Sequence, residues 1–295
     1  MRLKIATRGS ELALTQTKMV ARMLQDTYPG LSLEIRIFKT KGDRVTDAPL
    51  SSVGGEGLFV KELERALAAE EVDLAVHSLK DMPTVTKNGL MLASVLERGD
   101  VRDALISKHD GGFKALPKGA RIGTSSPRRR AQMLGHRPDL TVVNIRGNLD
   151  TRLKKLEETD LDAIVLAAAG LDRMGWGDRI TERLSCEIIL PAVGQGALAI
   201  QTRCDNKVMP LVQTLNHDPT ALAVTAERGF LYALSGGCQT PIGAWARFHG
   251  EALWVDGLVA ATDGAWLVRD TIAGSPDDAE ALGAQLAEQV QQKLP

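Results

Sequence analysis

Short apolar stretches rich in β-branched residues alternate with amphipathic helical patterns over the first two thirds of the chain. The expected strands are 3–7, 33–38, 72–78, 121–125, 140–145 and 161–167. The expected helices are 11–25, 58–70, a segment after Pro127, and 148–158. This alternation is typical of α/β lobes with a mostly parallel, helix-covered sheet.

The run 187–203 is apolar, but Pro191, Gly194 and Gly196 interrupt it. Such residues favour turns, so we expect two short strands around a turn or crossover. We expect the chain to return there to the first lobe.

After His217 the pattern changes. Asp218 followed by Pro219 predicts an N-cap and a helix that ends at Gly236. Three segments of alternating polarity follow, at 241–249, 252–262 and 265–274, and a last helix opens after Ser275. This predicts a small α+β domain with a three-stranded sheet. The expected domains are 1–96 with 197–215, 97–196, and 216–295.

Composition narrows the classes of protein. The 295 residues carry a formal net charge of −1, which argues against non-specific nucleic-acid binding. The chain has three cysteines, an odd and small number for its length, so we expect no disulfide framework. No apolar run reaches the ~18 residues of a membrane span, and the first residues lack a signal-peptide pattern, so we expect a cytosolic protein.

Basic or small polar residues recur where predicted strands end, which is where open α/β sheets bind ligands. They are Arg8, Ser10, Thr124, Ser126, Arg128, Arg129, Arg146, Arg152 and Arg173. Ser126 can cap a helix that begins at Pro127, and a capped helix start with arginines favours carboxylates or phosphates. Because consecutive helical residues point ~100° apart, Arg128, Arg129 and Arg130 cannot all face one ligand, and we expect at least one to be solvated. Alternatives are a solvated basic face or a nucleic-acid patch, although no interleaved aromatics supply stacking.

One acid stands among these bases. Lys80 and Asp81 follow the predicted strand 72–78. An aspartate facing basic residues should have a lowered pKa and can stabilise a developing cation. The alternative is that Asp81 only caps the turn before Pro83. We interpret His77 as a hydrogen-bonded strand histidine, and no His/Cys group has the spacing of metal ligands.

Cys238 lies between two glycines and a proline, on a short link from a helix to a strand. A thiol there can be a nucleophile or an attachment point. Residue chemistry alone favours the simpler interpretation, a buried structural cysteine, and Cys186 and Cys204 keep that interpretation.

The residues around Cys238 carry a family resemblance. The stretch "ERGFLYALSGGCQTPIG" (227–243) resembles the signature of porphobilinogen deaminases, also called hydroxymethylbilane synthases. Further blocks resemble that family in the same order: "IATRGSELAL", "GGEGLFVKELE", "DLAVHSLKDMP", "IGTSSPRRRAQ", "IRGNLDTRL", "DAIVLAAAGLDRMG" and "LPAVGQGALAI".

The resemblance implies two lobes like those of periplasmic anion receptors, flanking a cleft, plus a cofactor-bearing C-terminal domain. It implies a cytosolic, monomeric transferase that joins four porphobilinogen molecules head to tail with release of ammonia. Dipyrromethane, attached through a thioether to Cys238, would be the primer, and hydroxymethylbilane for porphyrin synthesis the product.

The resemblance also implies roles for the residues above. Asp81 would stabilise the azafulvene-like electrophile left by ammonia. Cofactor contacts would come from Lys80, Asp81, Thr124, Ser126, Arg128, Arg129 and Arg146. Substrate contacts would come from Arg8, Ser10, Arg146, Arg152, Arg173 and Gln195.

The chain departs from the family pattern at a few positions. Many relatives have lysines where this chain has Ser52 and Glu56, so only Lys61 is a candidate for a basic contact from that loop. Pro127 replaces an aliphatic residue, which the first position of a helix tolerates. Two other functions stay open: an anion-binding module without chemistry, which has no use for Cys238 or Asp81, and a nucleic-acid binder.

Overall fold

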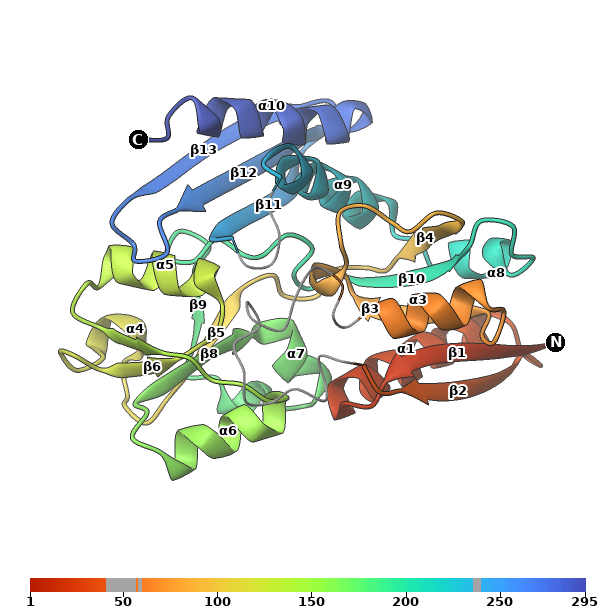
Figure 1. Cartoon of the computed structure of the whole chain (residues 1–295), viewed down its shortest axis with the longest axis horizontal. Coiled ribbons are helices and arrows are strands. Elements are labelled where there is room, and N and C mark those ends of the chain that lie inside the picture. The colour runs from red at the N-terminus through yellow and green to blue at the C-terminus, as the bar shows by residue number, and fades with distance from the viewer. Residues whose placement is uncertain (41–56, 58–59, 236–239) are drawn as a thin grey trace. The chain divides into compact units, whose positions relative to one another are not determined.

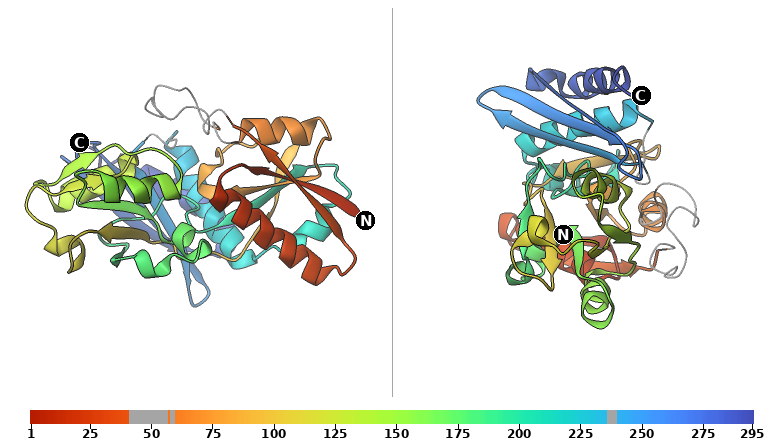
Figure 2. Two further views of the ribbon diagram at one scale, coloured as in Figure 1. Left: turned by 90° about the horizontal axis from the view of Figure 1, so that it is seen from below. Right: turned by 90° about the vertical axis from the view of Figure 1, so that its left-hand side faces the viewer.

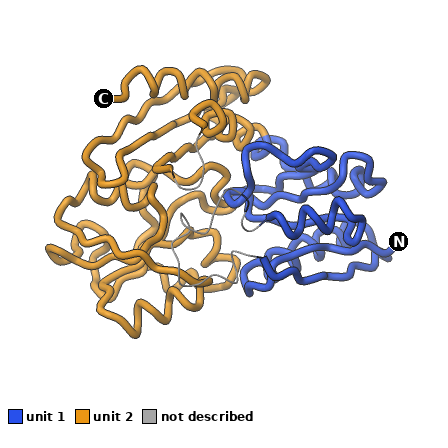
Figure 3. The backbone as a smooth tube through the Cα atoms, in the orientation of Figure 1, with its two compact units in different colours: residues 1–98, 197–221 blue, residues 99–196, 222–295 orange. Residues whose placement is uncertain are grey.

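A computed structural model of the chain describes residues 1–40, 57, 60–235 and 240–295. The chain forms two compact units (Figure 3). Unit 1 comprises 1–98 and 197–221, and unit 2 comprises 99–196 and 222–295. In the described residues no helix combines the length and the apolar character that crossing a bilayer requires.

Unit 1 contains a five-stranded sheet in the order β2-β1-β3-β10-β4 (Figure 1). Its strands are β1 (Arg2–Arg8), β2 (Ser32–Phe38), β3 (Leu74–Ser78), β4 (Leu90–Val95) and β10 (Leu198–Arg203). Its described helices are α1 (Glu11–Thr27), α3 (Lys61–Ala68) and α8 (Met209–Gln213), with the 3-10 turn η2 (Leu79–Asp81) after β3. Because side chains alternate along a strand, Ile5 packs with α1 and α8 while its neighbour Ala6 packs with α3.

Unit 2 contains a second five-stranded sheet, in the order β7-β6-β8-β5-β9. Its strands are β5 (Asp103–Ser107), β6 (Arg121–Gly123), β7 (Thr141–Val143), β8 (Ala163–Ala167) and β9 (Glu182–Leu184). The helices around it are α4 (Gly112–Ala115), α5 (Pro127–His136), α6 (Leu149–Glu158) and α7 (Ala168–Arg173), followed by the turn η3 (Gly177–Arg179). One buried cluster joins this sheet to α4 and α5, and another joins it to α6 and α7.

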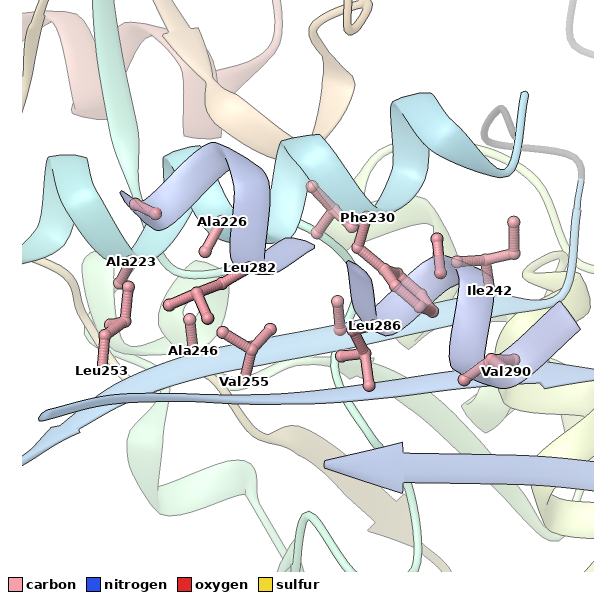
Figure 4. Packing of buried hydrophobic residues seen from close by; sticks show 14 of the residues in the cluster. Ala223, Ala226, Phe230, Ile242, Ala246, Leu253, Val255, Leu282, Leu286 and Val290 are labelled. Atoms are coloured by element: carbon pink, nitrogen blue, oxygen red, sulfur yellow. The ribbon is translucent and has the colours of Figure 1, made fainter. Parts of the chain in front are cut away.

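The rest of unit 2 is a three-stranded antiparallel sheet with helices on one face (Figure 2). It consists of β11 (Ile242–His249), β12 (Ala252–Ala260), β13 (Leu267–Gly274), α9 (Asp218–Ala233), the turn η4 (Pro276–Asp278) and α10 (Ala279–Gln291). Phe230 of α9, Leu286 of α10 and Val255 of β12 belong to one buried cluster between these helices and the sheet (Figure 4). Leu258, on the other face of the sheet, packs against Ala131 of α5. The α/β class with a small three-stranded C-terminal sheet is thus confirmed.

One strand of each five-stranded sheet runs against the other four. Strands joined by helical crossovers are parallel, as expected, but β10 runs antiparallel to β3 and β4, and β5 runs antiparallel to β8 and β9. Both strands enter their sheets from connections without a helix, which carry no right-handed crossover that would impose a parallel direction. In each five-stranded sheet four strands point the same way and one is reversed, so the predicted mostly parallel sheets form, each with one antiparallel strand.

Two local predictions also need correction. Only the second strand expected in 187–203 forms, as β10, because Ile189 N instead closes a turn onto Ser185 O at 3.0 Å. Helix α9 ends at Ala233, and the left-handed residue after it is Ser235, with φ 50°. The cap of α9 is His217 rather than Asp218, since Ala221 N donates to His217 O at 2.9 Å. Gly236 lies outside the described residues.

Candidate active site

The first group of predicted site residues lies at one edge of the unit 1 sheet. Strands β1 and β3 are parallel neighbours, so their carboxyl ends meet there. Arg8 ends β1, and Asp81 lies in η2 directly after β3. Arg8 Nη1 is 3.8 Å from Asp81 Oδ2, and the two side chains are 22% and 35% exposed. The structure therefore brings this predicted acid and base together within reach of solvent.

Ser10 and Lys80 flank that pair in the chain. Ser10 caps α1, and its hydroxyl accepts a hydrogen bond from Ala13 N at 3.3 Å. Lys80 is half-buried in η2, next to Asp81. Both residues are thus located near the carboxyl ends of β1 and β3, as the sequence pattern predicted.

His77 is a buried strand histidine, as predicted. Its Nε2 lies 3.1 Å from Gln201 Oε1, and Gln201 Nε2 donates to Glu64 Oε1 at 3.1 Å. Burial, with a smaller contribution from the charge of Arg8, lowers the pKa of His77 to about 4. The imidazole is therefore neutral at pH 7 and donates through Nε2 to the Gln201 oxygen.

The second group of predicted residues lies at the end of β6 in unit 2. Ser126 caps α5 by accepting from Arg129 N at 3.4 Å, and Pro127 occupies the first turn, so the predicted helix start is confirmed. The Thr124 hydroxyl accepts from Ser126 N at 3.2 Å and is buried. These two hydroxyls fix the start of the helix that carries Arg128 and Arg129.

Arg128 and Arg129 converge on one buried acid, Asp103 at the start of β5. Arg128 Nη1 donates to Asp103 Oδ2 at 2.7 Å, and Arg129 Nη2 donates to Oδ1 at 2.6 Å. The arginines are 4% and 6% exposed, and Asp103 is fully buried. Burial alone would raise the pKa of Asp103, but the charges of and hydrogen bonds from both arginines outweigh it and hold that pKa well below its ordinary value. We name Asp103, Arg128 and Arg129 the arginine cluster.

The arginine cluster carries a net positive charge, because two guanidinium groups share one carboxylate. Arg128 Nε is buried and has no hydrogen-bond partner among the described residues. Arg130 is half-buried, so it is the one arginine of this triplet that stays in contact with solvent. Its Nη1 also donates to Val142 O at 3.0 Å.

Gln195 joins the arginine cluster. Its amide nitrogen donates to Asp103 Oδ1 at 3.0 Å and to Val101 O at 2.7 Å, and the residue is fully buried. Arg173, at the end of α7, donates through Nη2 to Gly196 O at 2.5 Å. Gly99 N also donates to Gly196 O, at 3.1 Å, so Gln195 and Arg173 hold the two chain segments that leave unit 2.

Arg146 lies in the segment between β7 and α6. Lys155 Nζ donates to Arg146 O at 3.1 Å, and Arg152 Nε donates to Gly147 O at 2.9 Å. Asn148 caps α6 by accepting from Thr151 N at 2.9 Å. These contacts fix the backbone that carries Arg146.

Cys238, Ser52 and Glu56 lie outside the described residues, while Lys61 is exposed at the start of α3. Of the other cysteines, Cys204 is exposed and Cys186 is partly buried. Burial raises the pKa of the Cys186 thiol to about 11. A thiol with that pKa is almost entirely protonated at pH 7 and is a poor nucleophile.

The sequence patterns did not identify Asp103, the acid that pairs with Arg128 and Arg129, as a site residue. The available signal was an acid that opens the apolar strand "DALIS", because a buried carboxylate requires a cationic or hydrogen-bonding partner. The patterns also did not identify Glu227, which is fully buried in α9.

The fold and these side chains define an α/β protein with guanidinium groups and one accessible acid at strand ends, the features of a protein that handles organic anions. Residues 3–210 match the model of the porphobilinogen deaminase dipyromethane cofactor binding domain, and residues 221–292 match that of the porphobilinogen deaminase C-terminal domain. The chain belongs to the porphobilinogen deaminase family.

Curated relatives match over nearly the whole chain. The porphobilinogen deaminase of Syntrophotalea carbinolica is 50% identical over 97% of this chain and 91% of its own. That of Bacillus subtilis is 51% identical, with the same coverage of both chains. A solved TRAP periplasmic solute binding protein from Desulfovibrio salexigens is 11% identical, with a TM-score of 0.43, over 73% of this chain and 72% of that one.

Family membership establishes the reaction. The chain is a transferase of porphyrin biosynthesis that polymerises porphobilinogen, with release of ammonia, to hydroxymethylbilane. Dipyrromethane is its cofactor.

Proposed function

We propose that the arginine cluster and Arg146 hold carboxylates of the dipyrromethane primer, and that Cys238 is its point of attachment. The observation that carries the proposal is the net positive charge of the cluster together with the unpartnered Arg128 Nε. Dipyrromethane bears acetate and propionate groups, and a carboxylate is the ligand that would compensate both the charge and the free donor. The residues present therefore fit this cofactor. The raised pKa of the Cys186 thiol argues against Cys186 as the attachment point.

Asp81 is the proposed catalytic carboxylate. Arg8 and the half-buried Lys80 lie beside it. When bound, the primer supplies a nucleophilic pyrrole carbon to which substrate units are added. Loss of ammonia from porphobilinogen leaves a cationic carbon conjugated to the pyrrole nitrogen. The Asp81 carboxylate stabilises that cation and accepts a hydrogen bond from the pyrrole N–H.

Substrate carboxylates bind, in this proposal, to Arg8, Arg152 and Arg173, with hydrogen bonds from Ser10 and Gln195. Thr124 and Ser126 support the primer side. The half-buried guanidinium of Arg173, held on Gly196 O, is already oriented without substrate. Such preorganisation reduces the conformational entropy that is lost when Arg173 binds a carboxylate of the substrate.

The three domains 1–96 with 197–215, 97–196 and 216–295 belong to the same proposal, and the separate core under β11–β13 supports the last of them. We also infer a cytoplasmic monomer that binds no nucleic acid. The near-zero net charge supports the absence of nucleic-acid binding, and the family's biosynthetic role supports the location. The cleft between the lobes stays a prediction.

The intact mass of the purified chain tests the attachment. We expect the native chain to carry the mass of two linked pyrroles, and Cys238→Ser to carry none after incubation with porphobilinogen. Cys204→Ser, which alters an exposed cysteine, is the matched control and should load normally. A Cys238→Ser chain that gains the adduct, or a native chain that never does, would overturn the proposal.

A further inference from the structure

The carboxylate of Glu227 is a buried junction between three parts of unit 2. Glu227 lies on α9 and is fully buried. Its Oε2 accepts a hydrogen bond from Gly194 N at 2.7 Å, and its Oε1 accepts one from Ala246 N at 2.8 Å. One side chain thus binds α9 to strand β11 and to the turn that contains Gly194.

That turn and β11 are also joined directly. Ala244 N donates to Pro191 O at 3.0 Å, and Val193 packs in the same apolar cluster as Ala226 of α9. Gly194 has φ 70°, a left-handed conformation that disfavours other residues, and its amide points at the carboxylate. The turn therefore has a fixed place against α9 and β11.

The next residue of the turn continues the connection. Gln195 donates to Asp103 Oδ1 at 3.0 Å, and Asp103 binds the guanidinium groups of Arg128 and Arg129. A continuous series of buried hydrogen bonds, interrupted only by the peptide link from Gly194 to Gln195, runs from Glu227 to the arginine cluster.

We propose that Glu227 is a positioning residue for the transferase reaction: it holds the arginine cluster in a fixed relation to α9 and β11. Helix α9 precedes Cys238 in the sequence and β11 follows it, so these elements set the two ends of the segment that carries the attachment thiol. The inference rests on the proposed function of Cys238 and the arginine cluster. Glu227 acts through other residues and touches no reacting atom.

The substitution Glu227→Gln tests this inference. The amide keeps the size of the side chain but presents an NH₂ group to one of two backbone N–H donors, so one of the two contacts is lost. We expect the unloaded variant, incubated with porphobilinogen, to attach the primer roughly 10- to 100-fold more slowly than the native chain, with intact mass as the readout. A misplacement of about 1 Å can reduce a rate by that factor. In the loaded fraction kcat should fall with a smaller change in KM.

Two controls separate positioning from stability. Glu288→Gln makes the same chemical change on the exposed face of α10 and should load at the native rate. Leu286→Ala destabilises the same core without touching Glu227, and it too should load at the native rate below its melting temperature. Amide exchange at Gly194 and Ala246 should accelerate in Glu227→Gln relative to Leu286→Ala.

The outcomes are distinguishable. If the native chain does not load through Cys238, the proposed function fails, whatever Glu227→Gln does. If the native chain loads and Glu227→Gln loads and turns over like Leu286→Ala, the inference about Glu227 is wrong. If Glu227→Gln does not fold, Glu227→Asp decides: its carboxylate is one methylene too short for both N–H groups, and native loading by that variant overturns the inference.

Discussion

At the scale of single residues, accessibility separates the acid that can meet substrate from the acid that cannot. Asp81 is partly exposed beside Arg8, whereas Asp103 is enclosed by Arg128 and Arg129. Only a group that reaches the reacting atoms can stabilise charge as it develops. Asp81 is therefore the catalytic candidate, and Asp103 orients the arginines.

For Asp81→Asn we expect turnover to fall at least ~100-fold, because the amide carries no charge to offset the substrate cation. The melting temperature should change little, since Asp81 contributes no core packing. The measurement is kcat on chains shown by mass to be loaded, with the exposed Asp178→Asn as control. Undiminished turnover in Asp81→Asn would remove this residue from the mechanism.

His77 allows a pH prediction with a definite sign. Its folded pKa of about 4 lies below the unfolded value of 6.5. As pH falls from 6.5 toward 4, the unfolded chain binds a proton that the folded chain does not, so stability is lost over that window, by roughly 3 kcal/mol in total. In His77→Gln the free energy of unfolding should fall less between pH 7 and 4.5. The exposed His136→Gln should behave like the native chain, and identical pH curves for His77→Gln and native chain would refute the idea.

At the scale of elements, the crossing of α9 and α10 depends on glycine. A Cβ placed on Gly283 would overlap the Ala226 carbonyl oxygen and lie 2.6 Å from Phe230 N, both backbone atoms of α9. Backbone cannot move aside as a flexible side chain can, so the helices must separate.

We therefore expect Gly283→Ala to lower the free energy of unfolding of unit 2 by about 1–3 kcal/mol. As a control, Gln285→Ala on the same helix should leave the free energy of unfolding unchanged, because Gln285 is exposed. Urea unfolding of both variants is the measurement. A Gly283→Ala chain as stable as Gln285→Ala would show that the helices do not approach this closely.

Elements with local signals could be predicted from the sequence, and those set by distant partners could not. The start of α5 follows from Ser126 and Pro127 alone. The directions of β5 and β10 depend on strands far away in the chain, and the turn at Ser185–Ile189 forms in a run whose apolar pattern suits a strand. Likewise the positions of Arg128 and Arg129 could be predicted from the sequence, but their shared partner Asp103 could not. Asp103 lies about 25 residues before them, and the helix and strand periodicities relate only residues that are close in the sequence.

At the scale of the whole molecule, cofactor and fold should stabilise each other. The unloaded chain keeps a buried cluster with one uncompensated positive charge and an unpartnered N–H, which costs stability. In the proposed function a primer carboxylate bound there would remove both costs. Loading would then raise the stability of unit 2.

We expect the loaded chain to melt about 4–8 °C above Cys238→Ser, since a hydrogen bond to a charged group contributes about 2 kcal/mol and each kcal/mol shifts a protein of this size by about 2–4 °C. In Arg128→Gln the remaining Asp103–Arg129 pair is neutral, so a primer carboxylate gains less and the difference between loaded and unloaded chains should shrink. Lys118→Gln, an exposed change in the same unit, should keep the full difference. Calorimetry of loaded and unloaded forms of each variant makes the comparison. If the difference survives intact in Arg128→Gln, the primer's carboxylates are held elsewhere, and the arginine cluster is a structural ion pair only.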